Sequence, residues 1–200
     1  LGDVYKRQGK QCNLVGEIQH HSKVFSLLGK PGQLKELCGK LVQYGMEHVE
    51  IALGERLSYP EERILRGYPA DFLETEHDPL AVVLCKNEKP ISWVTHGMPD
   101  EAFLREKVPM TKEEIREVSI CKLHLGRESI IYDVGAGSGS LSVEMAQVSY
   151  EGTVYAVEKN PDAVELLQKN RCRFGVDNLE IIEGYAPEAL EHLPAPTHVF

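Results

Sequence analysis

The chain has 200 residues, of which 42% are hydrophobic and 26% charged, a balance typical of a folded globular protein. Its formal net charge of −9 argues against nucleic-acid binding, because proteins that bind a phosphate backbone gain affinity from positive surfaces. The longest apolar runs, such as residues 80–85, are far too short to span a bilayer. We therefore expect a soluble cytoplasmic protein that binds neither nucleic acid nor membrane.

The cysteines and histidines predict neither a disulfide framework nor a metal site. The five cysteines are widely scattered and lack the paired C-x-x-C spacing of zinc sites. The histidines show no spacing typical of metal ligands either. This pattern fits a protein of a reducing compartment that binds no metal through its own side chains.

Both ends of the sequence indicate a fragment. Residues 1–8, LGDVYKRQ, resemble a translated sequencing adaptor, and we exclude them from the fold. Residues 197–200 are typical of the beginning of a strand. We therefore expect a chain that lacks regions of the whole protein at both ends.

Residues 9–91 predict a small α/β unit. Strands are expected at residues 24–28, 48–53 and 80–85, with turns between them. A helix is expected at residues 31–44, where apolar side chains recur at helical spacing and Gly45 ends the pattern. The polar, Pro- and Gly-containing stretch 86–99 then suits a connection, so we place a domain boundary near Ser92.

Residues 92–200 predict an alternation of helices and strands. Thr111 and Glu114 have the form of a capping box before a helix at 112–123. Strands are expected at 129–134, 153–157 and 179–182, and helices at 140–148 and from Asn160-Pro161 toward Gly175. This order predicts a parallel, doubly wound sheet whose ligands lie beyond the carboxyl ends of its strands.

A glycine-rich turn at this edge is the strongest functional motif. The sequence DVGAGSG at 133–139 leaves a strand and enters a helix, so a ligand can approach the backbone closely. The helix N-terminus favours an anionic group, and Glu158, at the end of the next strand, can accept hydrogen bonds from ribose hydroxyls. The pattern indicates a nucleotide-type ligand. The alternative is a purely structural role, in which the glycines form a tight turn and Glu158 only caps or solvates the start of the following helix.

Three further segments resemble the decarboxylating precorrin-6B carbon-15 methyltransferases. They are GMPDEAF at 97–103, VPMTKEEIR at 108–116 and EGYAPEAL at 183–190. The segment GERLSYPEERI at 54–64 is similar to the carboxyl half of the precorrin carbon-5 methyltransferases, which are tetrapyrrole methylases. The whole chain resembles the fused precorrin-6Y C5,15-methyltransferases of cobalamin biosynthesis.

The resemblance implies a Rossmann-like class I methyltransferase domain at 92–200, preceded by the carboxyl-terminal α/β subdomain of a tetrapyrrole methylase at 9–91. It implies S-adenosylmethionine as the cofactor and a precorrin or cobalt-precorrin as the substrate. The residues that match the family's cofactor site are Thr111, Gly135, Ala136, Gly137, Ser138, Gly139, Glu158 and Ala186. This sequence has Tyr185 at a position where similar proteins often carry an acidic or polar residue. No catalytic side chain is assigned.

Several alternatives stay open at this stage. A nicotinamide-dependent oxidoreductase would use a similar turn, but Ser140 stands where its third glycine belongs. A non-catalytic adenosyl-nucleotide-binding module is a further alternative. Lys112 and Arg116 would either meet substrate carboxylates or form solvated surface. The sequence does not decide whether the substrate carries cobalt, nor the oligomeric state, a homo-oligomer included.

Overall fold

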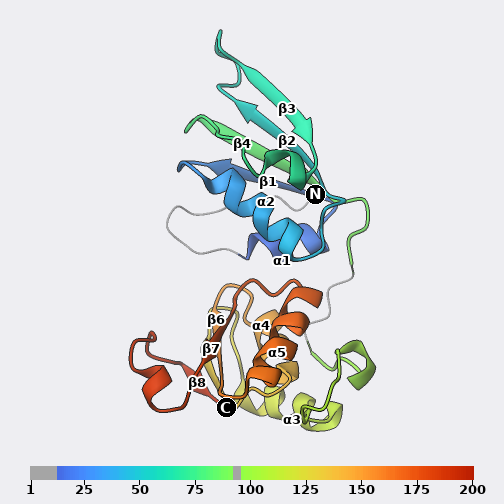
Figure 1. Ribbon diagram of the computed structural model, residues 1–200, viewed down its shortest axis with the longest axis vertical. Helices are drawn as coiled ribbons and strands as arrows, with labels where there is room; N and C mark the ends of the chain where they lie inside the picture. The colour runs from blue at the N-terminus through green and yellow to red at the C-terminus, as the bar shows by residue number, and fades with distance from the viewer. Residues whose placement is uncertain (1–12, 92–95) are drawn as a thin grey trace. The chain divides into compact units, whose positions relative to one another are not determined.

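The computed structural model describes residues 13–91 and 96–200, so the expected adaptor at 1–8 and the boundary at Ser92 lie outside the described residues. The chain divides into two compact units, Leu1–Ser92 and Trp93–Phe200 (Figure 1). Within the described ranges, no helix is both long and apolar enough to cross a membrane.

The first unit is built on a four-stranded antiparallel sheet. Its strands are β1 (Lys23–Leu28), β2 (Glu50–Glu55), β3 (Arg63–Gly67) and β4 (Ala81–Lys86), in the order β1-β4-β2-β3. β2 begins two residues later than expected, because the chain turns first and the amide of Val49 donates to the carbonyl of Met46. β3 was not predicted. It is an edge strand whose side chains are mostly exposed, so it lacks a buried alternating pattern.

Two helices and a short 3-10 turn complete this unit. α2 (Gln33–Gln43) confirms the predicted helix and buries the apolar positions that its spacing indicated, Leu34, Leu37 and Leu41. It packs against the 3-10 turn η1 (Pro69–Phe72). α1 (Leu14–His20) was not predicted. Asn13 caps it, since its side chain accepts a hydrogen bond from the amide of Gly16.

The second unit contains the predicted parallel sheet. Its strands are β5 (Ile130–Val134), β6 (Thr153–Glu158), β7 (Leu179–Glu183) and β8 (His198–Val199), in the order β7-β6-β5-β8, and all described pairs are parallel. The chain first moves from β5 through β6 to β7 and then returns to the other side of β5. This reversal is a topological switch point, the place where open parallel sheets bind ligands.

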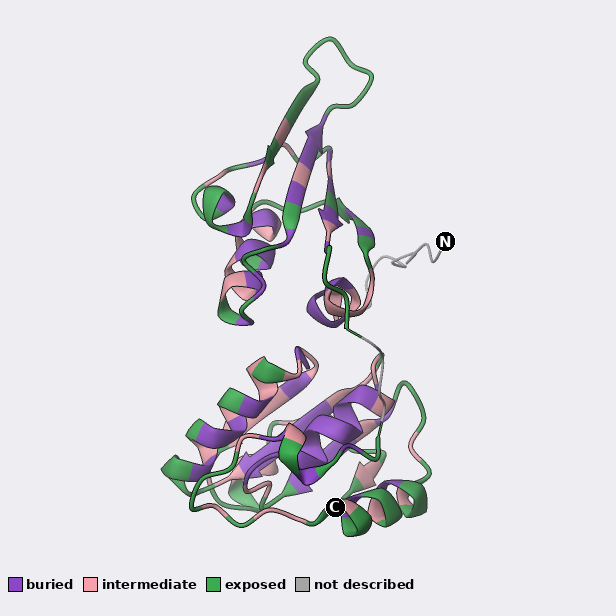
Figure 2. Cartoon of the chain, turned by 90° about the vertical axis from the view of Figure 1, so that its right-hand side faces the viewer, coloured by how far each residue is buried: buried purple, intermediate pink, exposed green. Residues whose placement is uncertain are grey.

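Helices cover this sheet and form the core with it. α4 (Ser140–Val148) and α5 (Pro161–Arg173) pack beside each other on the strands, and α3 (Glu113–Leu123) packs on α4. Figure 2 shows the buried residues concentrated in the strands and in the helices that pack on them, and α4 is almost entirely buried. Short 3-10 turns, η2 (Asp100–Ala102) and η3 (Glu188–Leu190), lie in the connections. The predicted start of α5 is confirmed, since Asn160 accepts a hydrogen bond from the amide of Asp162.

The expected capping box at Thr111 and Glu114 is wrong. The residue before α3 is Lys112, and no side chain caps this helix. The Thr111 carbonyl instead accepts a hydrogen bond from the Arg116 guanidinium at 2.6 Å. The helix therefore starts one residue later than the local cap signal indicates, and the backbone of Thr111 serves the buried cation instead.

Gly152 is a position where the fold accepts no side chain. A Cβ there would lie 2.0 Å from the carbonyl oxygen of Ser129, which is itself bonded to the amide of Thr153. We expect Gly152→Ala to lower the free energy of unfolding by roughly 2 kcal/mol or more, measured by urea denaturation, because the backbone must move. Gly126→Ala is the control, since the nearest atom is a serine hydroxyl at 3.8 Å. Equal stability of the two variants would contradict this packing.

Candidate functional site

A pocket of about 530 Å³ opens at the carboxyl edge of the parallel sheet, beside the switch point. The irregular segment 108–111 forms one wall, and the glycine-rich turn after β5 forms another. Phe200 and Ala163 also line the pocket. Six of the eight residues predicted to bind a cofactor line it together: Thr111, Gly135, Ala136, Gly137, Ser138 and Glu158.

The glycine-rich turn presents backbone to this pocket because its conformation excludes side chains. Gly135, Gly137 and Gly139 have φ values of 86°, 56° and 75°, a region that residues other than glycine rarely adopt. A Cβ at Gly137 would lie 3.4 Å from the carbonyl oxygen of Pro109, so the two segments approach each other closely here. Gly139 is outside the pocket lining and is instead the N-cap of α4, where a Cβ would meet Leu167 at 2.7 Å.

Glu158 lies at the end of β6 with its carboxylate held by backbone amides. One oxygen accepts from the amides of Lys159 and Asn160 at 2.8 and 2.9 Å, and the other accepts from the amide of Gly137 at 2.8 Å. Burial acts to raise the pKa of this carboxyl, but the amides of Asn160, Gly137 and Lys159 outweigh burial and hold the pKa below its ordinary value. The group is therefore a fixed negative charge at the pocket.

Asp133 also lines the pocket, although the sequence did not single it out as a site residue. Only 3% of it is exposed, and burial raises the pKa of its carboxyl to about 6, an effect that the hydrogen bond from Ser142 partly offsets and the charge of Glu158 strengthens. Its position as the first residue of the glycine-rich motif was the available signal. Two neighbouring carboxyls thus have opposite pKa shifts.

Ala186 lies apart from the other predicted residues. It lines a second hollow, formed by the segment from Glu183 to Ala189 after β7. The two hollows adjoin the same sheet edge, since the amide of Gly184 donates to the carbonyl of Glu158. The ring of Tyr185 is 5.1 Å from the ammonium of Lys159, which lines the main pocket. The structure therefore does not bring Ala186 into one pocket with the glycine-rich turn.

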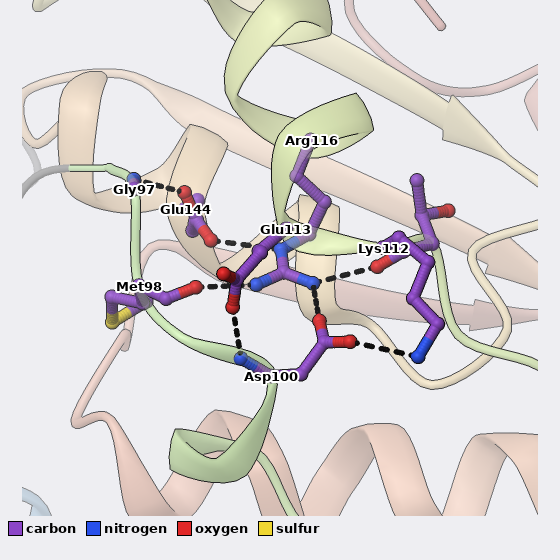
Figure 3. A network of polar contacts seen from close by, with 8 residues as sticks. Gly97, Met98, Asp100, Lys112, Glu113, Arg116 and Glu144 are labelled. Atoms are coloured by element: carbon purple, nitrogen blue, oxygen red, sulfur yellow. Dashed lines mark hydrogen bonds and ion pairs between the residues drawn. The ribbon is translucent and has the colours of Figure 1, made fainter.

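Arg116 belongs to a buried polar network behind the pocket wall (Figure 3). Its side chain is fully buried and donates to Glu144 at 2.9 Å and to Asp100 at 2.7 Å, as well as to the carbonyls of Thr111 and Met98. Both interpretations of Arg116 from sequence, a substrate contact or a solvated cation, are therefore wrong. Lys112 is exposed and pairs with Asp100 at 3.1 Å.

The comparison with known families decides the classification of the chain. The Precorrin methyltransferase domain family matches residues 101–200, which is half of the chain. The chain belongs to this family. The match covers the parallel sheet, the glycine-rich turn and the pocket. The predicted Rossmann-like methyltransferase fold is confirmed.

Similar proteins carry names of the same kind. A protein of Sulfolobus acidocaldarius named probable cobalt-precorrin-6B C(15)-methyltransferase (decarboxylating) is 52% identical over 99 residues, covering 48% of this chain and 52% of that protein. The Salmonella typhimurium cobalt-precorrin-6B C(15)-methyltransferase (decarboxylating) is 50% identical over 91 residues, covering 45% and 47%. The chain thus spans about half the length of the curated relatives it matches.

Solved structures agree with these relatives. The precorrin-6y C5,15-methyltransferase of Geobacter metallireducens has a TM-score of 0.53 and 34% identity, covering 55% of this chain and 58% of that one. The C-terminal domain of the Rhodobacter capsulatus precorrin-6Y C5,15-methyltransferase has a TM-score of 0.50 and the same identity and coverage. The oxidoreductase and the non-catalytic module, left open by the sequence, receive no support from these comparisons.

The buried carboxyl of Asp133 should make stability fall as the pH rises. Its folded-state pKa of about 6 lies above the value of about 3.9 in an unfolded chain, so the folded state holds the proton more tightly. The resulting stabilisation is fully present below about pH 4 and is lost as the pH rises through about 6. We expect the free energy of unfolding to fall by about 2–3 kcal/mol across this window relative to that of Asp133→Asn, which cannot titrate. Urea denaturation of both proteins measures this difference, and a pH-independent difference would contradict it.

Proposed function

We propose that the chain is part of an S-adenosylmethionine-dependent enzyme that methylates carbon 15 of a precorrin or cobalt-precorrin, with decarboxylation of the acetate at carbon 12. The observation that carries this proposal is the pocket formed by the glycine-rich turn, Glu158 and the segment 108–111, within the part of the chain that matches the family. The names of the relatives supply the substrate and the reaction.

The pocket suits the charges of an adenosylmethionine ligand. α4 begins directly after the glycine-rich turn, and its N-cap, Gly139, has no side chain that could occupy the amides of the first turn. Such amides favour an anionic group, here the ligand's carboxylate, by roughly 0.3–1 kcal/mol in exposed settings. Glu158 and Asp133 supply negative charge for a sulfonium. When bound, S-adenosylmethionine would supply an electrophilic methyl group on that sulfonium.

Glu158 has limited capacity for a ribose. A carboxylate offers about four lone-pair sites, and backbone amides occupy three of them. The remaining site, on the oxygen that faces Gly137, would accept one ribose hydroxyl. Accepting both hydroxyls, as the sequence suggested, would require the Gly137 amide to release the carboxylate.

Exposed cations in the pocket lining and in the segment before it would serve a polycarboxylate substrate. Arg105 and Lys107 are exposed on the segment that leads into the pocket wall, and Lys159 lines the pocket itself. Precorrins carry several acetate and propionate groups, which pair well with such cations. A few placed cations of this kind are compatible with the net charge of −9 of the whole chain.

The residues would act by binding and orientation. The glycine-rich turn and Glu158 would fix where a cofactor lies, and the segment at Thr111, which also lines the pocket, would limit how it can turn. Alignment of two reactants can contribute several kcal/mol without a nucleophile on the protein, so no side chain needs to form a covalent bond. For the residues of the first unit, we propose the carboxyl-terminal half of a tetrapyrrole methylase.

Binding of S-adenosylhomocysteine tests the proposed cofactor. We expect saturable binding to the chain by titration calorimetry and loss of that binding, by tenfold or more, in Gly137→Val. The valine would strain a backbone with a φ of 56° and place its Cβ 3.4 Å from the carbonyl oxygen of Pro109. Gly126→Ala, outside the pocket, is the control and should bind as wild type does. Binding of NADH instead would favour an oxidoreductase, and binding of neither ligand by a folded chain would leave the turn a purely structural element.

Methyl transfer tests the proposed reaction. A protein extended to the length of the relatives is incubated with methyl-labelled S-adenosylmethionine and either precorrin-6B or its cobalt complex. We expect one labelled methyl group on the tetrapyrrole for each carbon dioxide released, and no label in Gly137→Val. Binding of S-adenosylhomocysteine without labelling of either tetrapyrrole would reject the substrate class while leaving the cofactor assignment intact.

A further inference from the structure

The pocket wall at 108–111 is part of a segment without helix or strand. From Leu104 to Lys112 the backbone forms only bends and irregular structure, and most of its side chains are at least partly exposed. Met110 packs against the hydrophobic core, and the carbonyl of Pro109 approaches the glycine-rich turn. A segment of this kind has no ladder of hydrogen bonds to fix its path, so its position depends on how its ends are held.

Arg116 holds the carboxyl end of this segment. Its guanidinium donates to the Thr111 carbonyl at 2.6 Å, and the same group reaches Glu144 of α4 and Asp100. It also lies 4.8 Å from the centre of the Phe103 ring. Burial acts to lower the pKa of Arg116, but its hydrogen bonds with the two carboxylates raise it above the ordinary value, so the group stays charged. Thr111 is thereby tied to the helix that begins at the glycine-rich turn.

Asn170 of α5 holds the amino end. Its side-chain oxygen accepts from the amide of Leu104 at 2.8 Å, and its side-chain nitrogen donates to the Leu104 carbonyl at 3.2 Å and to the Ser138 carbonyl at 2.9 Å. This side chain is fully buried. One asparagine therefore fastens the segment directly to the glycine-rich turn, which also lines the pocket.

We propose that Arg116 and Asn170 are positioning residues that hold the segment 104–111 as the outer wall of the cofactor pocket. Neither lines the pocket, so each acts through the backbone that it fixes. The inference rests on the proposed cofactor site for its effect on binding. The clamp itself can be tested without any ligand.

Trypsin tests the clamp, because Arg105 and Lys107 lie within the segment. We expect Asn170→Ala and Arg116→Lys to accelerate cleavage after these two residues roughly tenfold, since each change removes hydrogen bonds that hold the segment. Lysine keeps the charge of Arg116 but cannot reach its four acceptors. Cleavage after Arg127, which lies in an exposed turn before β5 at the opposite edge of the sheet, reports changes outside the segment and should accelerate much less.

Asn178→Ala is the matched control. Asn178 also fastens backbone carbonyls, those of Ala146 and Ser149, but it lies before β7 at the edge away from the pocket. Its variant should cleave after Arg105 and Lys107 at the wild-type rate. Equal acceleration at these sites and after Arg127 in all variants would mean that the two residues only stabilise the fold, and would overturn the proposal.

Ligand binding separates this inference from the proposed function. In wild type, S-adenosylhomocysteine should slow cleavage after Arg105 and Lys107, and Asn170→Ala should bind it about tenfold more weakly than Asn178→Ala does. If wild type fails to bind the ligand, the cofactor assignment falls, while the ligand-free cleavage still decides the clamp. If Asn170→Ala binds S-adenosylhomocysteine as tightly as Asn178→Ala does, binding does not depend on the hydrogen bonds of Asn170, and the positioning role is rejected.

Discussion

The second unit depends on satisfying one buried charge. Removing a guanidinium from water costs several kcal/mol unless acceptors surround it, and Arg116 is fully buried. Its acceptors come from three places in the chain, Met98 and Asp100, Thr111, and Glu144 of α4. These groups therefore cannot move independently. The constraint fixes the start of α3, the path of the chain before it and the helix that follows the glycine-rich turn.

A second constraint acts at the pocket, where two carboxyls share one sheet edge. Glu158 receives three backbone amides and remains ionised, whereas Asp133 is buried with one hydroxyl donor and binds its proton more tightly. The difference follows first from burial, since Asp133 is almost completely buried and Glu158 only partly, and then from the supply of donors, which is larger at Glu158. Near neutral pH the edge thus holds a firm negative charge beside the helix N-terminus, an arrangement that suits a ligand carrying both a cation and a carboxylate.

Most elements of the second unit could be predicted because their signals are local. β5, α4, β6 and the start of α5 follow from apolar periodicity, three glycines and the Asn160-Pro161 cap, all within a few residues of the structure they specify. β3 could not be predicted in the same way. Its side chains are mostly exposed, and its pairing with β2 is what makes it a strand.

The errors at the site have one physical origin, which is the distance along the sequence between interacting groups. Thr111 has the local form of a helix cap, yet its carbonyl serves Arg116, whose other partners lie 16, 18 and 28 residues away. Asn170 gave no local signal because its partners, Leu104 and Ser138, are 66 and 32 residues distant. A motif in one segment can reveal the turn that contacts a ligand. The residues proposed to hold the segment 104–111 in place become visible only when the folded chain brings their partners together.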